Sequence, residues 1–317
     1  MPAPNETPTP PSGHPRHEDD VLERIAAIVA RRTIPEGEFH VGDDAAVLAP
    51  FVGQTLVSTD AAVLGVHLDG ALFPLEDLGF KAVAAAVSDL AAMGARPRAA
   101  LVAVAAPPGT DLEELHRGIA DAAAVTNCPI VGGDLTTSSD VVVAVTVLGE
   151  CPDRGAVLRS GAVAGDEILV TGPLGRAAAG LRRRREGAPL SDELVVAHRR
   201  PWPRVEEGIA ARGAKAHAMM DLSDGLGLDL HRLADASGVG FSLTSIPVAE
   251  GATRDEAISG GEDYELVIVS DDPARLRMIF LDRGLRAPIT IGAILADTSV
   301  RLLEGVDFVR RGWQHQL

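Results

Sequence analysis

Aspartates next to glycine, serine or threonine recur along this chain where predicted strands and helices end. Six such groups occur: Gly42-Asp43-Asp44, Ser58-Thr59-Asp60, Ser88-Asp89, Gly132-Gly133-Asp134, Asp221-Leu222-Ser223-Asp224-Gly225 and Gly260-Gly261-Glu262-Asp263. Carboxylate and hydroxyl oxygens suit Mg²⁺, and glycine lets backbone amides approach a phosphate. Converging carboxylates repel one another, so such a cluster is stable only with cations present. The six groups therefore predict a site for Mg²⁺ and phosphate.

An ordinary structural role competes with this interpretation, because Asp, Ser and Gly are common in turns and helix caps. For a single Asp we expect capping or turn formation in roughly two cases of three. Two groups argue against it here. Asp43 and Asp44 are adjacent carboxylates that repel each other. Asp89 lies near the end of an otherwise apolar predicted helix, where a negative charge opposes the helix dipole.

Several other kinds of chemistry are excluded by missing motifs. Neither Lys81 nor Lys215 lies in a Walker G-K-[ST] context, and no G-x-G-x-x-G, H-R-D, H-E-x-x-H, EF-hand or G-x-S-x-G motif occurs. An enzyme acting on phosphates would therefore rely on carboxylate-bound Mg²⁺. We predict no side chain as a covalent nucleophile.

The elements that must position these groups mix helices and strands without strict β-α-β regularity. Predicted strands are Thr55–Thr59, Ala99–Ala106, Ile130-Val131, Val141–Leu148 (fully buried), Glu167–Thr171, Ala218–Asp221, Tyr264–Val269, Ile289–Ile294 and Val300–Leu303. Predicted helices cover residues 19–31, 75–93, 111–125, 174–185, 192–199, 204–212 and 225–236. This mixture predicts two α/β or α+β domains.

Composition sets the domain limits and excludes some partners. Residues 1–17 are rich in proline and predict a disordered tail, and Pro152 with three glycines in Cys151–Gly165 places a boundary between domains 18–150 and 151–317.

The 317 residues carry a formal charge of −16, which disfavours nucleic acid and anionic membranes as partners. No apolar run approaches the roughly 20 residues of a membrane span. The N-terminal residues contain no apolar signal-peptide region, so we expect a cytoplasmic protein.

The acidic groups belong to longer segments that share an order and spacing with a known family. The segments are V-G-D-D-A-A-V-L at Val41–Leu48, S-T-D-A-A-V-L-G-V-H-L at Ser58–Leu68, S-D-L-A-A-M-G-A at Ser88–Ala95, V-G-G-D-L-T at Val131–Thr136, R-S-G-A at Arg159–Ala162, D-L-S-D-G-L at Asp221–Leu226 and S-G-G-E-D-Y-E-L at Ser259–Leu266. Over nearly all of its length after the tail, the sequence resembles the thiamine-monophosphate kinase family. That family belongs to the superfamily of aminoimidazole-ribonucleotide synthetase and selenophosphate synthetase.

The resemblance implies phosphorylation of thiamine phosphate by ATP, giving thiamine diphosphate. It also implies a two-domain fold like that of aminoimidazole-ribonucleotide synthetase and a homodimer whose N-terminal domains share a β-barrel. Several Mg²⁺ ions are implied, with ligands Asp43, Asp44, Ser58, Thr59, Asp60, Asp89, Asp134, Asp221 and Asp224. ATP contacts are Gly132, Gly133, Asp134, Arg159 and Ser223, and thiamine phosphate contacts are His67, Glu262 and Trp313, with Phe308 as the alternative to Trp313. The acceptor phosphate is already ionised, so we expect direct in-line transfer without a phosphoenzyme.

The sequence departs from the family pattern at a few positions and leaves alternatives open. Ala86 stands where the family often has Asn, and Thr137-Ser138-Ser139 stands where an Arg often follows. Another ATP-using enzyme of the superfamily is one alternative, and a non-enzymatic divalent-cation-binding protein is another. For Tyr264 we expect packing within its strand, and for Arg182–Arg185 a solvated helical face.

Overall fold

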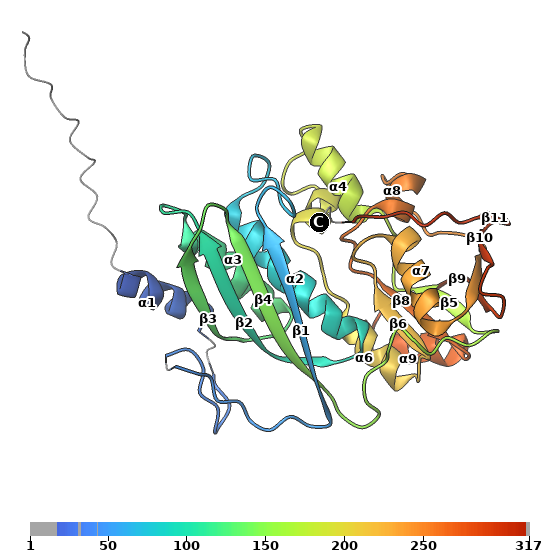
Figure 1. The fold of residues 1–317 in the computed structure, drawn as a ribbon, viewed down its shortest axis with the longest axis horizontal. Coiled ribbons are helices and arrows are strands. Elements are labelled where there is room, and N and C mark those ends of the chain that lie inside the picture. Colours follow the sequence, from blue (N-terminus) through green and yellow to red (C-terminus); the bar gives the residue numbers. More distant parts are fainter. Residues whose placement is uncertain (1–17, 31–32, 43, 315–317) are drawn as a thin grey trace, which may run out of the picture.

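The computed structural model describes residues 18–30, 33–42 and 44–314 (Figure 1). The predicted tail, residues 1–17, and the predicted metal ligand Asp43 lie outside the described residues. Within the described ranges, no helix has the length and apolar character needed to cross a membrane.

The first half of the chain builds a four-stranded sheet with the strand order β1-β4-β2-β3. Its strands are β1 (Gln54–Val63), β2 (Arg96–Ala106), β3 (Ile130–Thr137) and β4 (Val142–Cys151). The pairing of β2 with β3 is parallel, and β4 pairs antiparallel with both β1 and β2. Helices α2 (Leu75–Ala92) and α3 (Leu112–Val125) lie together on one face of this sheet, and α1 (Glu18–Val29) packs against α3 (Figure 1).

Two predictions for this sheet are wrong in ways that matter for the site. Strand β3 does not stop at Val131 but continues through Gly132-Gly133-Asp134, because glycine allows close approach to β2: a Cβ on Gly133 would lie 2.0 Å from the Val102 carbonyl oxygen. Strand β4 is not fully buried. Its residues alternate between buried and half-buried, because α2 covers only one of its faces.

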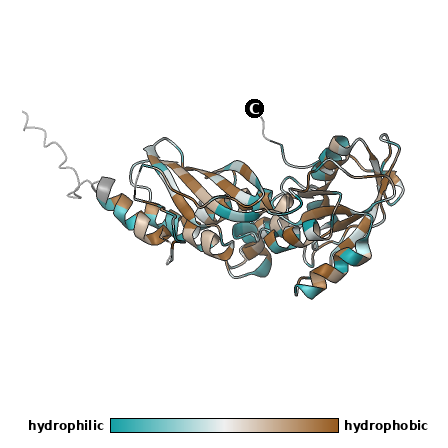
Figure 2. Cartoon of the chain, turned by 90° about the horizontal axis from the view of Figure 1, so that it is seen from below, coloured by the Kyte–Doolittle hydropathy of each residue, from teal (hydrophilic) through white to brown (hydrophobic). Residues whose placement is uncertain are grey.

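The second half builds a seven-stranded sheet with the strand order β11-β10-β7-β9-β5-β8-β6. Its strands are β5 (Glu167–Val170), β6 (Ala218–Asp221), β7 (Gly240–Leu243), β8 (Leu266–Ser270), β9 (Ile289–Leu295), β10 (Arg301–Leu303) and β11 (Val306–Asp307). Its helices are α4 (Arg176–Arg185), α5 (Glu193–Arg199), α6 (Val205–Gly213), α7 (Leu226–Ser237), α8 (Arg254–Ser259) and α9 (Pro273–Asp282). Apolar residues are concentrated in the strands of both sheets (Figure 2).

The short elements β7, β11 and α8, as well as α9, are absent from the sequence-based prediction. For α9 a usable signal exists, because Pro273 occupies the first turn and the Asp272 carboxylate accepts a hydrogen bond from the Arg275 amide. Strands of two to four residues carry too short a pattern to be recognised from periodicity alone.

Helix α2 joins the two halves and is buried along most of its length, because the first sheet covers one side and α6 and β6 approach the other (Figure 1). The buried carboxylate of Asp77 at its start accepts hydrogen bonds from Arg199 at 2.5 Å and from Arg200 at 2.9 Å. Further along, Ser88 donates to Asp221 of the second half at 2.7 Å. These contacts fix the position of α2, and of Asp89 on it, relative to the second sheet.

Candidate active site

A cavity of about 510 Å³ is lined by residues of both halves of the chain. The first half contributes the end of β1, the turn that follows it and one side of α2. The second half contributes α4, the loops after β6 and before β8, and the C-terminal segment. Predicted site residues that line this cavity are Thr59, Asp60, His67, Asp89, Asp221, Ser223, Asp224, Glu262 and Trp313.

Three carboxylates of this cavity, those of Asp60, Asp89 and Asp221, lie close enough for their negative charges to repel one another. The Ser58 hydroxyl donates to Asp89 at 2.5 Å. Burial, together with nearby Asp60, raises the pKa of Asp89, while the Ser58 hydrogen bond and Arg159 act in the opposite direction. Burial and the charge of Asp89 raise the pKa of Asp221 to about 7. A divalent cation would relieve this repulsion, so the cluster suits a metal-binding role.

These carboxylates do not form a closed metal cage. Among the residues that the structure describes, no group of three His, Cys, Asp or Glu side chains is arranged to hold an ion. Since Mg²⁺ retains waters and often binds through only one or two carboxylates plus substrate phosphates, the arrangement fits Mg²⁺ brought in with a nucleotide better than a permanent structural metal.

Four of the other described metal and glycine positions line a second cavity, of about 640 Å³, which also borders α1 and the edge of the sheet, whereas Ser58 lies beside Asp89 and lines neither cavity. They are Asp44, Gly132, Gly133 and Asp134. The strand register explains the separation, because Asp60 is aligned with Val145, Val145 with Val102, and Val102 with Gly133. Asp60 and the Gly133 region are therefore three strand spacings apart, about 14 Å. The chain brings the predicted ligands together in two groups rather than one.

The loop after β6 is shaped by Asp229, a residue that the sequence analysis missed. Its buried carboxylate accepts hydrogen bonds from the amides of Asp224 at 2.9 Å and Gly225 at 3.1 Å, and Arg232 pairs with both Asp224 and Asp229. Gly225 has φ +107°, a conformation that side chains rarely adopt. The only sequence signal for Asp229 is an acidic residue in the first turn of a helix.

The predicted acceptor contacts occupy the same cavity from different elements. The His67 Nδ1 accepts a hydrogen bond from the Val63 amide at 3.0 Å, so in the neutral ring the proton lies on Nε2. The Trp313 amide donates to the Asp224 carbonyl, and its side chain is 53 % exposed at the cavity. Phe308 is buried against Phe241 and His231 instead. Of the two aromatic candidates, the geometry favours Trp313.

The arginine run at Arg182–Arg185 is partly exposed, as predicted, but most of its side chains also have partners within the chain. Arg182 pairs with Glu256, Arg183 with Asp192, and Arg184 donates to the carbonyls of Leu72 and Ala188. Arg185 lines the cavity, beside the buried His198. The first three arginines therefore fix α4, and the fourth presents its guanidinium to the cavity. The sequence pattern does not indicate which arginine has which role.

The prediction for Tyr264 is wrong, because this residue precedes β8 rather than packing within it. Tyr264 has φ +49° and is buried while lining the cavity. Burial and the surrounding carboxylates, Glu262 first among them, raise its pKa well above the ordinary value. The ring therefore stays a neutral phenol.

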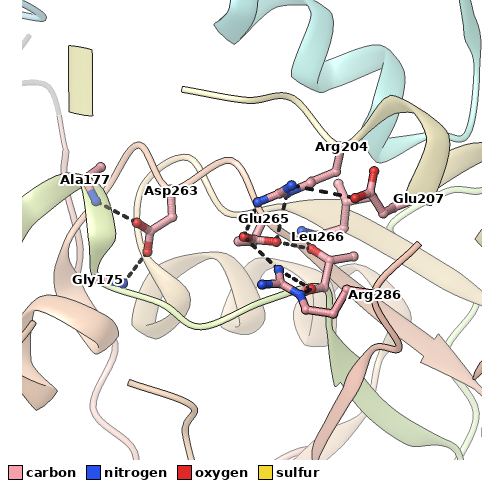
Figure 3. A network of polar contacts seen from close by, with 9 residues as sticks. Gly175, Ala177, Arg204, Glu207, Asp263, Glu265, Leu266 and Arg286 are labelled. Atoms are coloured by element: carbon pink, nitrogen blue, oxygen red, sulfur yellow. Dashed lines mark hydrogen bonds and ion pairs between the residues drawn. The ribbon is translucent and has the colours of Figure 1, made fainter. Parts of the chain in front are cut away.

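The loop that carries Glu262 and Tyr264 is anchored on both sides (Figure 3). The half-buried Asp263 carboxylate accepts hydrogen bonds from the amides of Gly175 at 2.5 Å and Ala177 at 2.9 Å, at the beginning of α4. Glu265 accepts from Arg204 at 2.6 Å and from the Thr171 hydroxyl at 2.5 Å. The loop is therefore held on both sides by contacts within the chain.

Replacing Asp263 tests this anchor. We expect Asp263→Ala to lower the free energy of unfolding by about 2 kcal/mol, because two buried amides lose their acceptor. Burial raises the pKa of Asp263 to about 7 from 3.8, so its stabilising contribution is largest at low pH and declines as the pH rises through 7. Denaturant unfolding should therefore show a larger loss at pH 5 than at pH 8. Asp272→Ala, at an exposed helix cap, is the control. No loss at either pH in Asp263→Ala would contradict the anchor, and an equal loss at both would contradict the raised pKa of Asp263.

Comparison with family models gives the class of protein. Residues 42–151 match the N-terminal domain model of AIR synthase related proteins, and residues 163–303 match the C-terminal domain model. The chain is therefore a two-domain AIR synthase related protein, with the mixed α/β architecture described above.

More specific matches give the family. Thiamine-monophosphate kinase from Mycobacterium tuberculosis is 37 % identical over 292 residues, which cover 86 % of this chain and 84 % of the relative. The crystal structure of thiamine-monophosphate kinase from Stenotrophomonas maltophilia has a TM-score of 0.79 at 32 % identity, covering 90 % of this chain and 96 % of that one. A structure of AaThiL complexed with AMPPCP and TMP has a TM-score of 0.74 at 26 % identity, covering 94 % and 97 %. The chain belongs to the thiamine-monophosphate kinase family.

Proposed function

We propose that this chain transfers the γ-phosphoryl group of ATP directly onto the phosphate of thiamine phosphate, by an in-line displacement assisted by Mg²⁺. ATP-dependent phosphorylation of thiamine phosphate is the activity of the family to which the chain belongs. A protein with the same fold has been solved with AMPPCP, an ATP analogue, together with TMP. The observation that carries the proposal is a single cavity that combines the repelling carboxylates Asp60, Asp89 and Asp221 with the candidate acceptor contacts His67, Glu262 and Trp313.

The metal-binding role is assigned to two groups of oxygen donors. We propose Ser58, Thr59, Asp60, Asp89, Asp221 and Asp224 as ligands in the larger group, and Asp43, Asp44 and Asp134 as ligands in the second. When bound, Mg²⁺ supplies positive charge between two polyanionic substrates. Asp224 already pairs with Arg232, so this arginine must release it or share it when a cation binds.

Nucleotide contacts are assigned to the glycine-rich strand and two side chains near the carboxylates. We propose Gly132, Gly133 and Asp134, with Arg159 and Ser223, as ATP contacts. Arg159 lies near enough to Asp89 to lower the pKa of that carboxyl group, and Ser223 lines the cavity. An arginine in this place can neutralise a phosphate while the carboxylates hold the cation.

The acceptor side is assigned to Glu262, Trp313 and His67. The thiazolium ring of thiamine carries a positive charge, which a carboxylate and an aromatic face both attract. No side chain needs to act as a strong base, because the acceptor phosphate is already ionised at neutral pH. The chain's contribution is therefore to bind and align the two phosphates.

A homodimer is part of the proposal. The face of the first sheet that α2 and α3 leave open carries apolar side chains, among them Val57, 65 % exposed, and Leu101, 41 % exposed. A second copy covering this face would complete a shared barrel and bury these residues. We also propose domains 18–150 and 151–317, a cytoplasmic location and no nucleic-acid partner.

Direct transfer is tested with purified protein, ATP, Mg²⁺ and thiamine phosphate, with products separated by chromatography. We expect thiamine diphosphate from thiamine phosphate, none from free thiamine, and no labelled protein after incubation with γ-labelled ATP alone. A stable phosphoprotein would rule out the in-line mechanism. Cation binding without product would favour the non-enzymatic alternative, and an ATP-dependent reaction on another acceptor would favour a different enzyme of the superfamily.

A further inference from the structure

Lys81 is a buried cation in the middle of the molecule, and the activity proposed above assigns it no role. It lies on α2 and is 1 % exposed. Its ammonium donates to the Glu262 carboxylate, with a distance of 2.6 Å between Nζ and Oε2, and to the His67 carbonyl at 2.9 Å. Lysine is rarely buried unless it is paired, so this position needs a reason beyond packing.

The two partners of Lys81 are both candidate acceptor contacts, and they come from opposite halves of the chain. His67 belongs to the turn after β1, and Glu262 to the loop before β8, 181 residues from Lys81. A single ammonium therefore connects the two loops that line the acceptor side of the cavity.

Lys81 also supplies the positive charge that balances the negative charge of the Glu262 carboxylate. A second basic group nearby is His198, whose Nδ1 lies 3.6 Å from Glu262. Burial, with the charges of Lys81 and Arg185, lowers the pKa of His198 to about 2, so this ring is neutral. Burial also lowers the pKa of Lys81, and the carboxylates of Glu262 and Asp77 oppose that change.

Glu262 depends on external support because its backbone is strained. It has φ +70°, outside the range that most side chains adopt, and its amide donates to the Ser223 carbonyl at 2.8 Å. Oxygen Oε2 is bound by Lys81. The other oxygen has no protein partner among the described residues, which leaves it for a ligand in the cavity.

We propose that Lys81 is a positioning residue for thiamine phosphate, which orients the Glu262 carboxylate and the His67 turn so that the acceptor meets a preformed pocket. This inference rests on the proposed function, because it takes Glu262 and His67 as acceptor contacts. ATP binding is not expected to depend on Lys81, since its ammonium touches neither the carboxylate cluster nor the glycine-rich strand.

Steady-state kinetics on both substrates test the role. Because a misplaced carboxylate weakens acceptor binding, we expect Lys81→Met to raise the KM for thiamine phosphate about 10- to 100-fold, with the KM for ATP changed less than about twofold. Glu262→Gln should act in the same way, and the double variant should be no worse than the more affected single variant. Lys215→Met, which removes the chain's only other lysine, at an exposed position, is the matched control. An unchanged KM for thiamine phosphate in Lys81→Met, or fully additive effects, would overturn the role.

A second measurement uses the unmodified chain and keeps the proposal testable if Lys81→Met does not fold. Since the sequence has only two lysines, lysine-labelled protein gives two sets of side-chain NMR signals, and Lys215→Met assigns them. We expect thiamine phosphate to shift the Lys81 signals and to leave those of Lys215 unchanged. If the protein makes thiamine diphosphate but its Lys81 signals do not shift when thiamine phosphate is added, the role of Lys81 alone is overturned. A protein that neither binds nor phosphorylates thiamine phosphate would overturn the proposed function as well.

Discussion

Asp89→Asn is expected to lower kcat by about a hundredfold or more, while the chain still folds. The Asp89 carboxylate lies between Ser58, which donates to it at 2.5 Å, and the like charges of Asp60 and Asp221. An amide in the same place keeps the shape and can still accept the serine hydrogen bond, but it offers a cation one neutral oxygen instead of a carboxylate. The expected loss is therefore in turnover and in Mg²⁺ dependence rather than in folding.

Thermal unfolding separates these effects. Without Mg²⁺, the variant should melt at the same temperature as the original chain or higher, because Asn removes a carboxylate whose pKa burial and Asp60 raise. With Mg²⁺ and an ATP analogue the original chain should gain stability, by about 2.7 kcal/mol at a hundred times Kd, and the variant should gain much less. Asp153→Asn, an exposed turn carboxylate, is the control. Near-normal kcat in Asp89→Asn would remove this residue from the metal site.

Local features of the sequence predict much of the larger cavity. Asp221 ends the short strand β6 and Asp224 follows it, and Asp89 lies in the last turn of a helix predicted within one residue of its bounds. Asp60 differs, because β1 does not end at Thr59 as predicted but continues through Asp60 to Val63. These positions depend on hydrophobic periodicity and turn residues over a few neighbours, which a single sequence records directly. The motifs that contain them then indicate which loops meet.

The residues that hold these groups in place could not be predicted in the same way. Lys81 pairs with Glu262 and Asp263 reaches the amide of Gly175, contacts that span 181 and 88 residues. Neither partner carries a local pattern that identifies the other. Similarly, Gly132-Gly133 resembles a turn in the sequence but continues β3, where the backbone of the neighbouring strand leaves no room for a side chain at Gly133. Long-range packing decides such positions.

The division of the predicted metal ligands follows from the same packing. Register places Asp60 and the Gly133 region on strands that are not neighbours, so motifs that look equivalent in the sequence lie in two cavities. A single chain thus leaves Asp44 and Asp134 apart from the larger carboxylate cluster, and it leaves an apolar sheet face open beside them. Both features make it important to test whether a second copy of the chain covers this face.

Leu101→Asp is expected to break the proposed homodimer. Leu101 lies in the middle of β2 on the open face, aligned with Thr146 of β4 and Gly132 of β3. If a second copy covers this face, the aspartate becomes a buried charge without a partner, which costs about 3 kcal/mol or more and raises the dimer Kd about a hundredfold or more. Sedimentation should show twice 33.0 kDa for the original chain and 33.0 kDa for the variant at micromolar concentration. Val57→Asp on β1 should act alike, because it faces the same side. Val306→Asp, at a 69 % exposed position on β11, should leave the mass unchanged. An original chain that sediments as a monomer, or a Leu101→Asp variant that remains a dimer, would show that this face is not the interface.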